Sequence, residues 1–223
     1  MKSNPLATRY VAPGKIPWHS HRGPTLDQLQ SRFFDQLHGR AAIVGPHGSG
    51  KSTLLEHLVP MLGRVVLRRS TGSLGEHPPD AYPPVSLQSV PGNGLRSVVW
   101  LQLRGRSASG RLLLETRPEW SRRGRLLVID GYEQLSHFRR WRALSLTRSS
   151  GTGLLITAHR TTYLPTLFET HVDVALAQQV LERLLPDDAV ERARMLDAER
   201  LTNLLAKHQG NLRELFMELY DEF

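Results

Sequence analysis

Cysteine is absent from the 223-residue chain. Disulfides, zinc–thiolate sites and a cysteine nucleophile are therefore excluded. Long apolar runs are missing too. The first 18 residues hold none of signal-peptide length, and no stretch approaches the roughly 18 apolar residues that a membrane-spanning helix requires. From these absences we expect a soluble, cytoplasmic protein that reaches a membrane only if a partner carries it there.

Acidic residues are scarce in most of the chain. Residues 1–160 hold 23 Lys+Arg against 9 Asp+Glu, whereas residues 161–223 hold 6 against 12, and the net charge is +8. A basic main part is compatible with contact to nucleic acid. Positive potential is equally what a protein needs to bind an anionic small molecule. The charge pattern therefore leaves DNA open as a partner without requiring it.

The first half of the chain reads as helices and strands in alternation. The capping box Thr25–Gln28 predicts a helix that ends near His38, with Gly39 as its stop. Residues 41–44 and 65–67 read as strands, separated by a helix that begins near Lys51 and ends by Pro60 or Gly63. Residues 70–95 read as a long loop, residues 97–103 fit strand or helix, and a helix is expected over 107–116.

Apolar runs dominate the second half. Residues 126–129 and 153–157 read as buried strands and residues 171–175 as a weaker one, with a helix following Asp130 through Trp141. Everything after about residue 177 reads as helical, with boundaries near Pro186 and Gly210. The alternation predicts an α/β fold with a doubly wound, mostly parallel sheet. We expect a core over residues 1–176, including an N-terminal arm, and a helical, lid-like segment over 177–223.

One segment carries a phosphate-binding pattern. The sequence GPHGSGKS at Gly45–Ser52 fits G-x-x-x-x-G-K-[ST] completely, after an apolar strand and before an amphipathic helix. Glycines let successive amides point at phosphate oxygens, and the helix N-terminus favours anions. Lys51 is expected to neutralise the β- and γ-phosphates, and Ser52 to coordinate Mg²⁺. The predicted nucleotide contacts are Gly45, His47, Gly48, Ser49, Gly50, Lys51, Ser52 and Thr53.

Asp130 ends an apolar strand, where a carboxylate can hold a Mg²⁺-bound water. It can instead cap the following helix. Most ATPases of this kind place a glutamate next, to polarise the attacking water, but this chain has Gly131 there. Glu133 is the nearest candidate base, and it can also serve merely as a first-turn acid of the helix. Thr157 or His159, at the end of the next strand, are candidates to sense the γ-phosphate.

These features together resemble the additional-strand class of P-loop ATPases, closest to the AAA+ and STAND groups. The segment 10–18 resembles the arm that packs on adenine in origin-recognition-type AAA+ ATPases, with Ile16, Pro17 and Trp18 at the matching positions. Gly210–Arg213, GNLR, resembles the sensor-2 motif of the AAA+ lid. The resemblance implies that Arg213 reaches the γ-phosphate, although a surface arginine after a helix break is the alternative.

The resemblance implies an ATP- and Mg²⁺-dependent ATPase or molecular switch. GTP is disfavoured because N-K-x-D and a suitably placed D-x-x-G are both missing. An arginine finger would come from a protein partner or self-association, with Arg139, Arg140 and Arg160 as candidates. Three alternatives stay open: a small-molecule or nucleotide kinase using the arginines between residues 104 and 111, a module that binds ATP without hydrolysis, and a DNA-associated ATPase.

Overall fold

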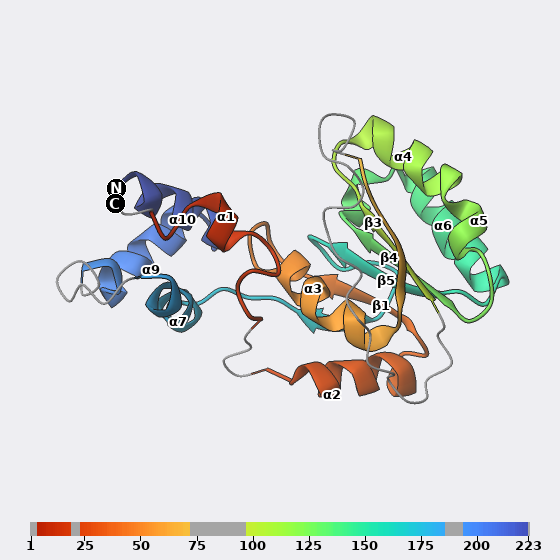
Figure 1. Cartoon of the computed structure of the whole chain (residues 1–223), viewed down its shortest axis with the longest axis horizontal. Coiled ribbons are helices and arrows are strands. Elements are labelled where there is room, and N and C mark those ends of the chain that lie inside the picture. Colours follow the sequence, from red (N-terminus) through yellow and green to blue (C-terminus); the bar gives the residue numbers. More distant parts are fainter. Residues whose placement is uncertain (1–3, 19–22, 72–96, 186–193, 223) are drawn as a thin grey trace. The chain divides into compact units, whose positions relative to one another are not determined.

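The computed structural model describes residues 4–18, 23–71, 97–185 and 194–222 (Figure 1). Contacts divide the chain into two compact units. The sheet unit comprises Leu26–Val44 and Leu58–Phe168. The tail unit comprises Met1–Thr25, Gly45–His57 and Glu169–Phe223. The tail therefore groups with the N-terminal segment and with the glycine-rich loop (Gly45–Ser52). The sequence had instead predicted a single domain boundary after residue 176.

A six-stranded sheet in the order β2-β3-β4-β5-β1-β6 organises the α/β fold. The pairs β2–β3, β3–β4, β4–β5 and β5–β1 are parallel. The prediction of a weaker strand at 171–175 is wrong, because the sixth strand, β6, lies earlier in the chain. The strands are β1 (Arg40–Val44), β2 (Val65–Ser70), β3 (Ser97–Gln102), β4 (Arg125–Asp130), β5 (Gly153–Ala158) and β6 (Thr166–Glu169).

Both faces of the sheet are buried, as the continuous apolar runs of its strands require. Helices α4 (Arg106–Glu115), α5 (Arg117–Trp120) and α6 (His137–Ser149) cover one face (Figure 1). Alternate residues of β3, β4 and β5 pack into the core on that side together with Trp120 and Tyr132. Helix α2 (Leu26–Ser31) and the π-helical turn Arg32–Gln36 lead into β1, with Leu29 and Phe33 fully buried.

The sequence predicted that a helix follows Asp130 directly, but in the structure a turn comes first. Gly131 adopts a left-handed φ of 88°, and a Cβ there would lie 2.5 Å from the Leu103 carbonyl oxygen, so only glycine fits this turn. A 3₁₀ turn over Tyr132–Gln134 follows. Helix α6 starts at His137 with Ser136 as its N-cap and continues past Trp141 to Ser149.

The tail unit has a core of its own. Helices α7 (Val174–Leu184), α9 (Ala198–Lys207) and α10 (Leu212–Asp221) bury leucine-rich faces against one another, with Asp173, Asp197 and Asn211 as N-caps. The Asp173 cap starts a helix where the sequence had suggested a strand. Helix α7 ends just before the expected boundary at Pro186, which lies outside the described residues, and Gly210 separates α9 from α10 as predicted.

The N-terminal segment packs on these helices. Leu6 belongs to the tail core, with Val11 and Ile16 packed against it, and the short helix α1 (Thr8–Val11) lies beside α10 (Figure 1). The Asn4 amide donates to the Tyr220 carbonyl at 2.9 Å. Among the helices of the described residues, none is both long and apolar enough to cross a membrane.

Candidate functional site

The glycine-rich loop joins β1 to helix α3 (Lys51–Leu62), so the predicted strand–loop–helix order is confirmed. The helical ladder of α3 begins with Leu54 N donating to the Gly50 carbonyl at 2.8 Å. The amides of Lys51, Ser52 and Thr53 therefore precede the first helical hydrogen bond, at the positive end of the helix dipole. This is the local geometry that anions favour.

Lys51 lies against its own loop. Its ammonium donates to the carbonyl oxygens of Gly45 at 2.7 Å and Pro46 at 2.5 Å, and only 8% of the residue is exposed. Ser49 donates to the same Pro46 carbonyl at 2.8 Å and shares a 2.6 Å hydrogen bond with the Thr170 hydroxyl. The loop is therefore closed on a nearly buried cation. Thr170, just after β6, contributes to it, and sequence reasoning had not singled this residue out.

The tip of the loop meets the start of helix α10 within the tail unit. The Asn211 side chain caps α10 by accepting from the amides of Arg213 at 3.1 Å and Glu214 at 3.3 Å. Gly48 has a φ of +66°, and a Cβ there would overlap Asn211 Oδ1. Glycine therefore lets the loop approach the cap closely. The sequence singled out Asn211 as part of the GNLR motif, and its position against the loop is a finding.

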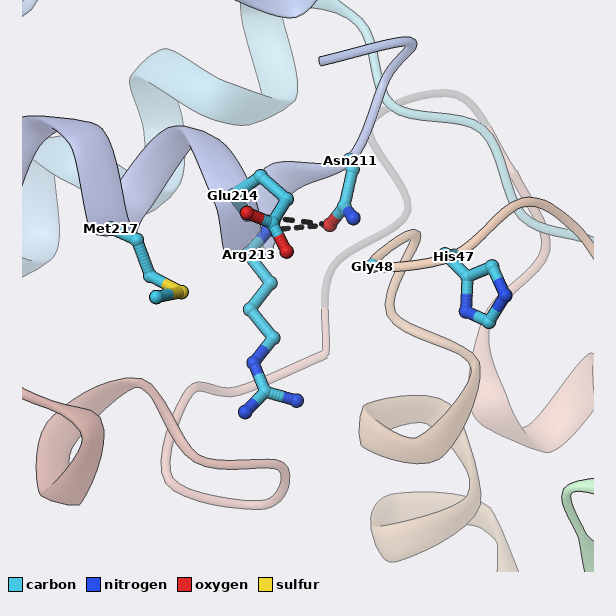
Figure 2. Close-up of a pocket in the computed structure, with 6 residues that line it drawn as sticks. All are labelled: His47, Gly48, Asn211, Arg213, Glu214 and Met217. Atoms are coloured by element: carbon cyan, nitrogen blue, oxygen red, sulfur yellow. Dashed lines mark hydrogen bonds between the residues drawn. The ribbon is translucent and has the colours of Figure 1, made fainter. Parts of the chain in front are cut away.

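A pocket of about 350 Å³ opens at this meeting point (Figure 2). Arg213 lies in the first turn of α10, and its exposed side chain extends away from the helix backbone on the side where the loop lies. A cation is slightly unfavourable beside a helix N-terminus unless an anion is near. The pocket is lined by His47, Gly48, Asn211, Arg213, Glu214 and Met217.

The N-terminal arm contacts both α3 and the tail core. His57, in the second turn of α3, hydrogen-bonds to the Ile16 carbonyl at 3.2 Å, and Gly14 lies against the Glu56 side chain. Ile16 also packs on the tail core. The arm thus joins α3 to the tail helices. The expected contact of Ile16, Pro17 and Trp18 with an adenine ring stays a prediction.

In the sheet unit, polar side chains gather at the carboxyl ends of β4 and β5. Asp130 Oδ1 accepts a 2.7 Å hydrogen bond from the Thr157 hydroxyl, which itself accepts from the Gly131 amide at 2.9 Å. Thr157 is 1% exposed. Its hydroxyl proton is directed at Asp130, so the side chain orients that carboxylate. The contact of Thr157 with the nucleotide, which the sequence suggested, stays a prediction.

Glu133 lies on the 3₁₀ turn and faces His159, with 3.3 Å between Glu133 Oε1 and His159 Nε2. Glu133 Oε2 is buried and has no hydrogen-bond partner among the described residues. The two residues follow the ends of β4 and β5 in the chain, close to the Asp130–Thr157 pair in sequence. The structure therefore brings Glu133 together with His159 at one edge of the sheet, a pairing that the sequence did not specify.

The candidate finger arginines differ in their surroundings. Arg140 donates to the carbonyls of Glu133 at 2.7 Å and Leu135 at 2.8 Å, and its guanidinium lies 5.6 Å from the centre of the Tyr132 ring. Burial raises the pKa of Tyr132 to about 12. Arg140 thus fastens the turn that carries Glu133. Arg139 packs against Gly110 of α4, and Arg160 is exposed.

Replacing Thr157 with valine is expected to lower the free energy of unfolding by about 1–3 kcal/mol, because the Gly131 amide loses its acceptor in a partly buried position. Chemical denaturation would measure the change. Thr157→Ser keeps the hydroxyl and is the matched control. Equal stability of the valine and serine variants would contradict the assignment of this hydroxyl as the link between Asp130 and Gly131.

Compared with protein-family models and with curated proteins, the chain matches none of them.

Proposed function

We propose that this protein binds ATP with Mg²⁺ and works as an ATPase or ATP-driven switch of the AAA+/STAND type. The observation that carries the proposal is the complete GPHGSGKS loop between β1 and α3, closed on Lys51. A nearly buried ammonium, held by carbonyls beside a helix N-terminus, is ready to exchange those carbonyls for phosphate oxygens.

The strand order supports the proposal that the protein is of the AAA+/STAND type. Strand β5 pairs with both β1 and β4, so one strand separates the strand before the loop from the strand that ends in Asp130. This insertion is what the additional-strand class of P-loop ATPases implies. In the parallel register Val44 lies opposite Ala158, and Ile129 opposite Ile156, so β1, β4 and β5 end at the same edge of the sheet. Ligands of such sheets bind at that edge.

The residues fit a Mg²⁺–nucleotide complex. Mg²⁺ prefers hard oxygen donors, and commonly takes one or two from the protein and the rest from phosphate and water. Ser52 and Asp130 are donors of this kind, and Thr157 orients the Asp130 carboxylate. The described residues contain no group of three or more acidic or histidine side chains that could hold a metal by themselves. When bound, Mg²⁺ would neutralise phosphate charge.

Hydrolysis would proceed by in-line attack of water on the γ-phosphorus. A bond forms from the water oxygen to phosphorus, the bond to the β,γ-bridging oxygen breaks, and ADP leaves with that electron pair. Glu133 would accept the water proton, with His159 holding the carboxylate. Lys51 and Arg213 would stabilise the charge that develops on the phosphate oxygens.

Calorimetry with a non-hydrolysable ATP analogue, ADP and GTP, each with and without Mg²⁺, tests the binding step. Phosphate release under the same conditions tests turnover. Tight, Mg²⁺-dependent binding without phosphate release would leave a non-hydrolysing module. Transfer of labelled phosphate to a small acceptor would favour the kinase alternative, and absence of nucleotide binding would overturn the proposal.

Arg213→Ala is expected to weaken ATP binding ten- to a hundredfold and to leave ADP binding almost unchanged. A charge-assisted hydrogen bond to the γ-phosphate contributes about 1.5–3 kcal/mol, and only ATP carries that group. Met217→Ala is the matched control, since Met217 lines the same pocket without a charge. Equal losses for the two nucleotides in Arg213→Ala would mean that α10 does not act as a lid helix.

A further inference from the structure

Two large aromatic side chains stand exposed on helix α6. Phe138 is 65% and Trp141 64% exposed, and their ring centroids lie 6.1 Å apart with the planes tilted by 30°. They are three residues apart and so share one side of the helix. The opposite side, with Ala143 and Thr147, is buried. The sheet-unit core therefore forms without these rings, and their exposure needs another explanation.

The stretch of chain that carries the rings is strongly basic. Residues 104–160 contain 12 arginines, no lysine and four acidic residues. Helix α6 itself carries four arginines and no acid, and it packs against α4 through Arg139, whose guanidinium occupies the space left by Gly110. On α6, Arg142 and Arg148 follow Phe138 and Trp141 by four and seven residues and so share the side of the helix that carries the rings. On α4, Arg106 and Arg111 are exposed and lie four residues before and one residue after Gly110, which Arg139 contacts. We call this ring-bearing side of α6, with the adjoining part of α4, the α4–α6 face.

We infer that the α4–α6 face binds single-stranded nucleic acid. Exposed rings on which bases can stack, set among guanidinium groups that attract phosphates, are the combination that such strands require. Arginine adds cation–π attraction to bases and rings. A duplex hides the faces of its bases and would use only the arginines. The rings therefore favour a strand with unpaired bases.

Two other occupants fit the face less well. A helix that lies on a membrane needs a long apolar side, whereas the α6 positions beyond Trp141 that are exposed, Ser145, Arg148 and Ser149, are polar. An acidic protein segment would satisfy the arginines, but it offers no series of flat partners for two adjacent rings. The inference concerns only the sheet unit and does not depend on the proposed ATPase activity.

The test is fluorescence anisotropy of a labelled 20-nucleotide oligothymidine, with the full chain, at low and at physiological salt. Oligouridine and a DNA duplex of equal length are run beside it. We expect single-strand binding that weakens steeply as salt is added. Binding releases cations condensed on the phosphates, and a higher salt concentration makes that release less favourable. Phe138→Ala and Trp141→Ala should each weaken it about 5- to 100-fold, as loss of one stacked base does. Comparison of DNA with RNA identifies which strand is preferred.

Tyr163→Ala is the matched control, because Tyr163 is 98% exposed and lies in the sheet unit outside α6. It should bind like the wild type. Quenching of intrinsic fluorescence on binding should be largely lost in Trp141→Ala, because Trp100 and Trp120 are buried and the half-buried Trp18 belongs to the tail unit. Thermal melting confirms that the variants fold. The inference is overturned if oligothymidine does not bind at low salt or if the duplex binds equally well. It is also overturned if polyglutamate or anionic vesicles displace oligothymidine as well as unlabelled oligothymidine does, or if the ring variants bind like the wild type.

Discussion

Lys51→Ala is expected to weaken binding of a non-hydrolysable ATP analogue by roughly 100-fold or more, because two or more charge-assisted hydrogen bonds to phosphate are lost together. The Lys51 ammonium is directed at the glycine-rich loop's own carbonyls and belongs to neither apolar core. The fold should therefore stay intact, and the thermal midpoint should fall only modestly, because the Gly45 and Pro46 carbonyls lose this donor. Isothermal titration calorimetry and thermal melting measure the two effects.

A matched charge removal separates this effect from a general change in potential. Arg117→Ala deletes one positive charge from an exposed position on α5, in the sheet unit. Its ATP affinity should match that of the wild type. If Lys51→Ala binds the analogue with unchanged affinity, the glycine-rich loop does not hold phosphates, and the proposed function fails with it.

Glu133→Gln is expected to slow ATP hydrolysis by about 10²- to 10⁴-fold and to leave ATP affinity nearly intact. Glutamine keeps an oxygen that can accept from His159, so the contact at 3.3 Å can survive while the basic carboxylate is lost. The substitution therefore tests proton transfer rather than the packing of the turn. Single-turnover phosphate release, together with calorimetry, gives the rate and the affinity separately.

Glu119→Gln provides the comparison for this substitution. Glu119, on α5, also has a buried Oε2 without a hydrogen-bond partner among the described residues, so the two changes replace similarly placed atoms. Only the Glu133 variant should lose turnover. An unaltered rate in Glu133→Gln would make Glu133 a structural residue of the 3₁₀ turn and require another base.

Most of the sheet follows from the sequence because its strands are buried on both sides. Apolar runs such as 126–129 and 153–157 can be satisfied only inside a covered sheet, and both form strands within a residue or so of the prediction. The ambiguous segment 97–103 is a strand as well, flanked by β2 and β4. The glycine-rich loop is equally predictable in position, since its pattern fixes strand, turn and helix together.

The errors arise where one polar residue outweighs an apolar pattern. The alternation at 171–175 suggested a strand, but Asp173 accepts from the Leu176 amide at 2.8 Å and starts α7 instead. The turn after Asp130 depends on the Leu103 carbonyl, which is distant in sequence. The Thr157–Asp130, Glu133–His159 and Ser49–Thr170 contacts likewise join residues at least 26 positions apart, so no local pattern reports them.

The contact between Gly48 and the cap of α10 changes how the phosphate-binding pattern should be read in this chain. In G-x-x-x-x-G-K-[ST], position 48 is one of the unrestricted positions, and a loop judged alone would accept many residues there. Here any side chain would collide with Asn211 Oδ1, the atom that starts the last helix. Position 48 is therefore restricted to glycine by Asn211, a residue 163 positions downstream. We expect that homologues with another residue at position 48 also lack this asparagine at the start of the corresponding helix.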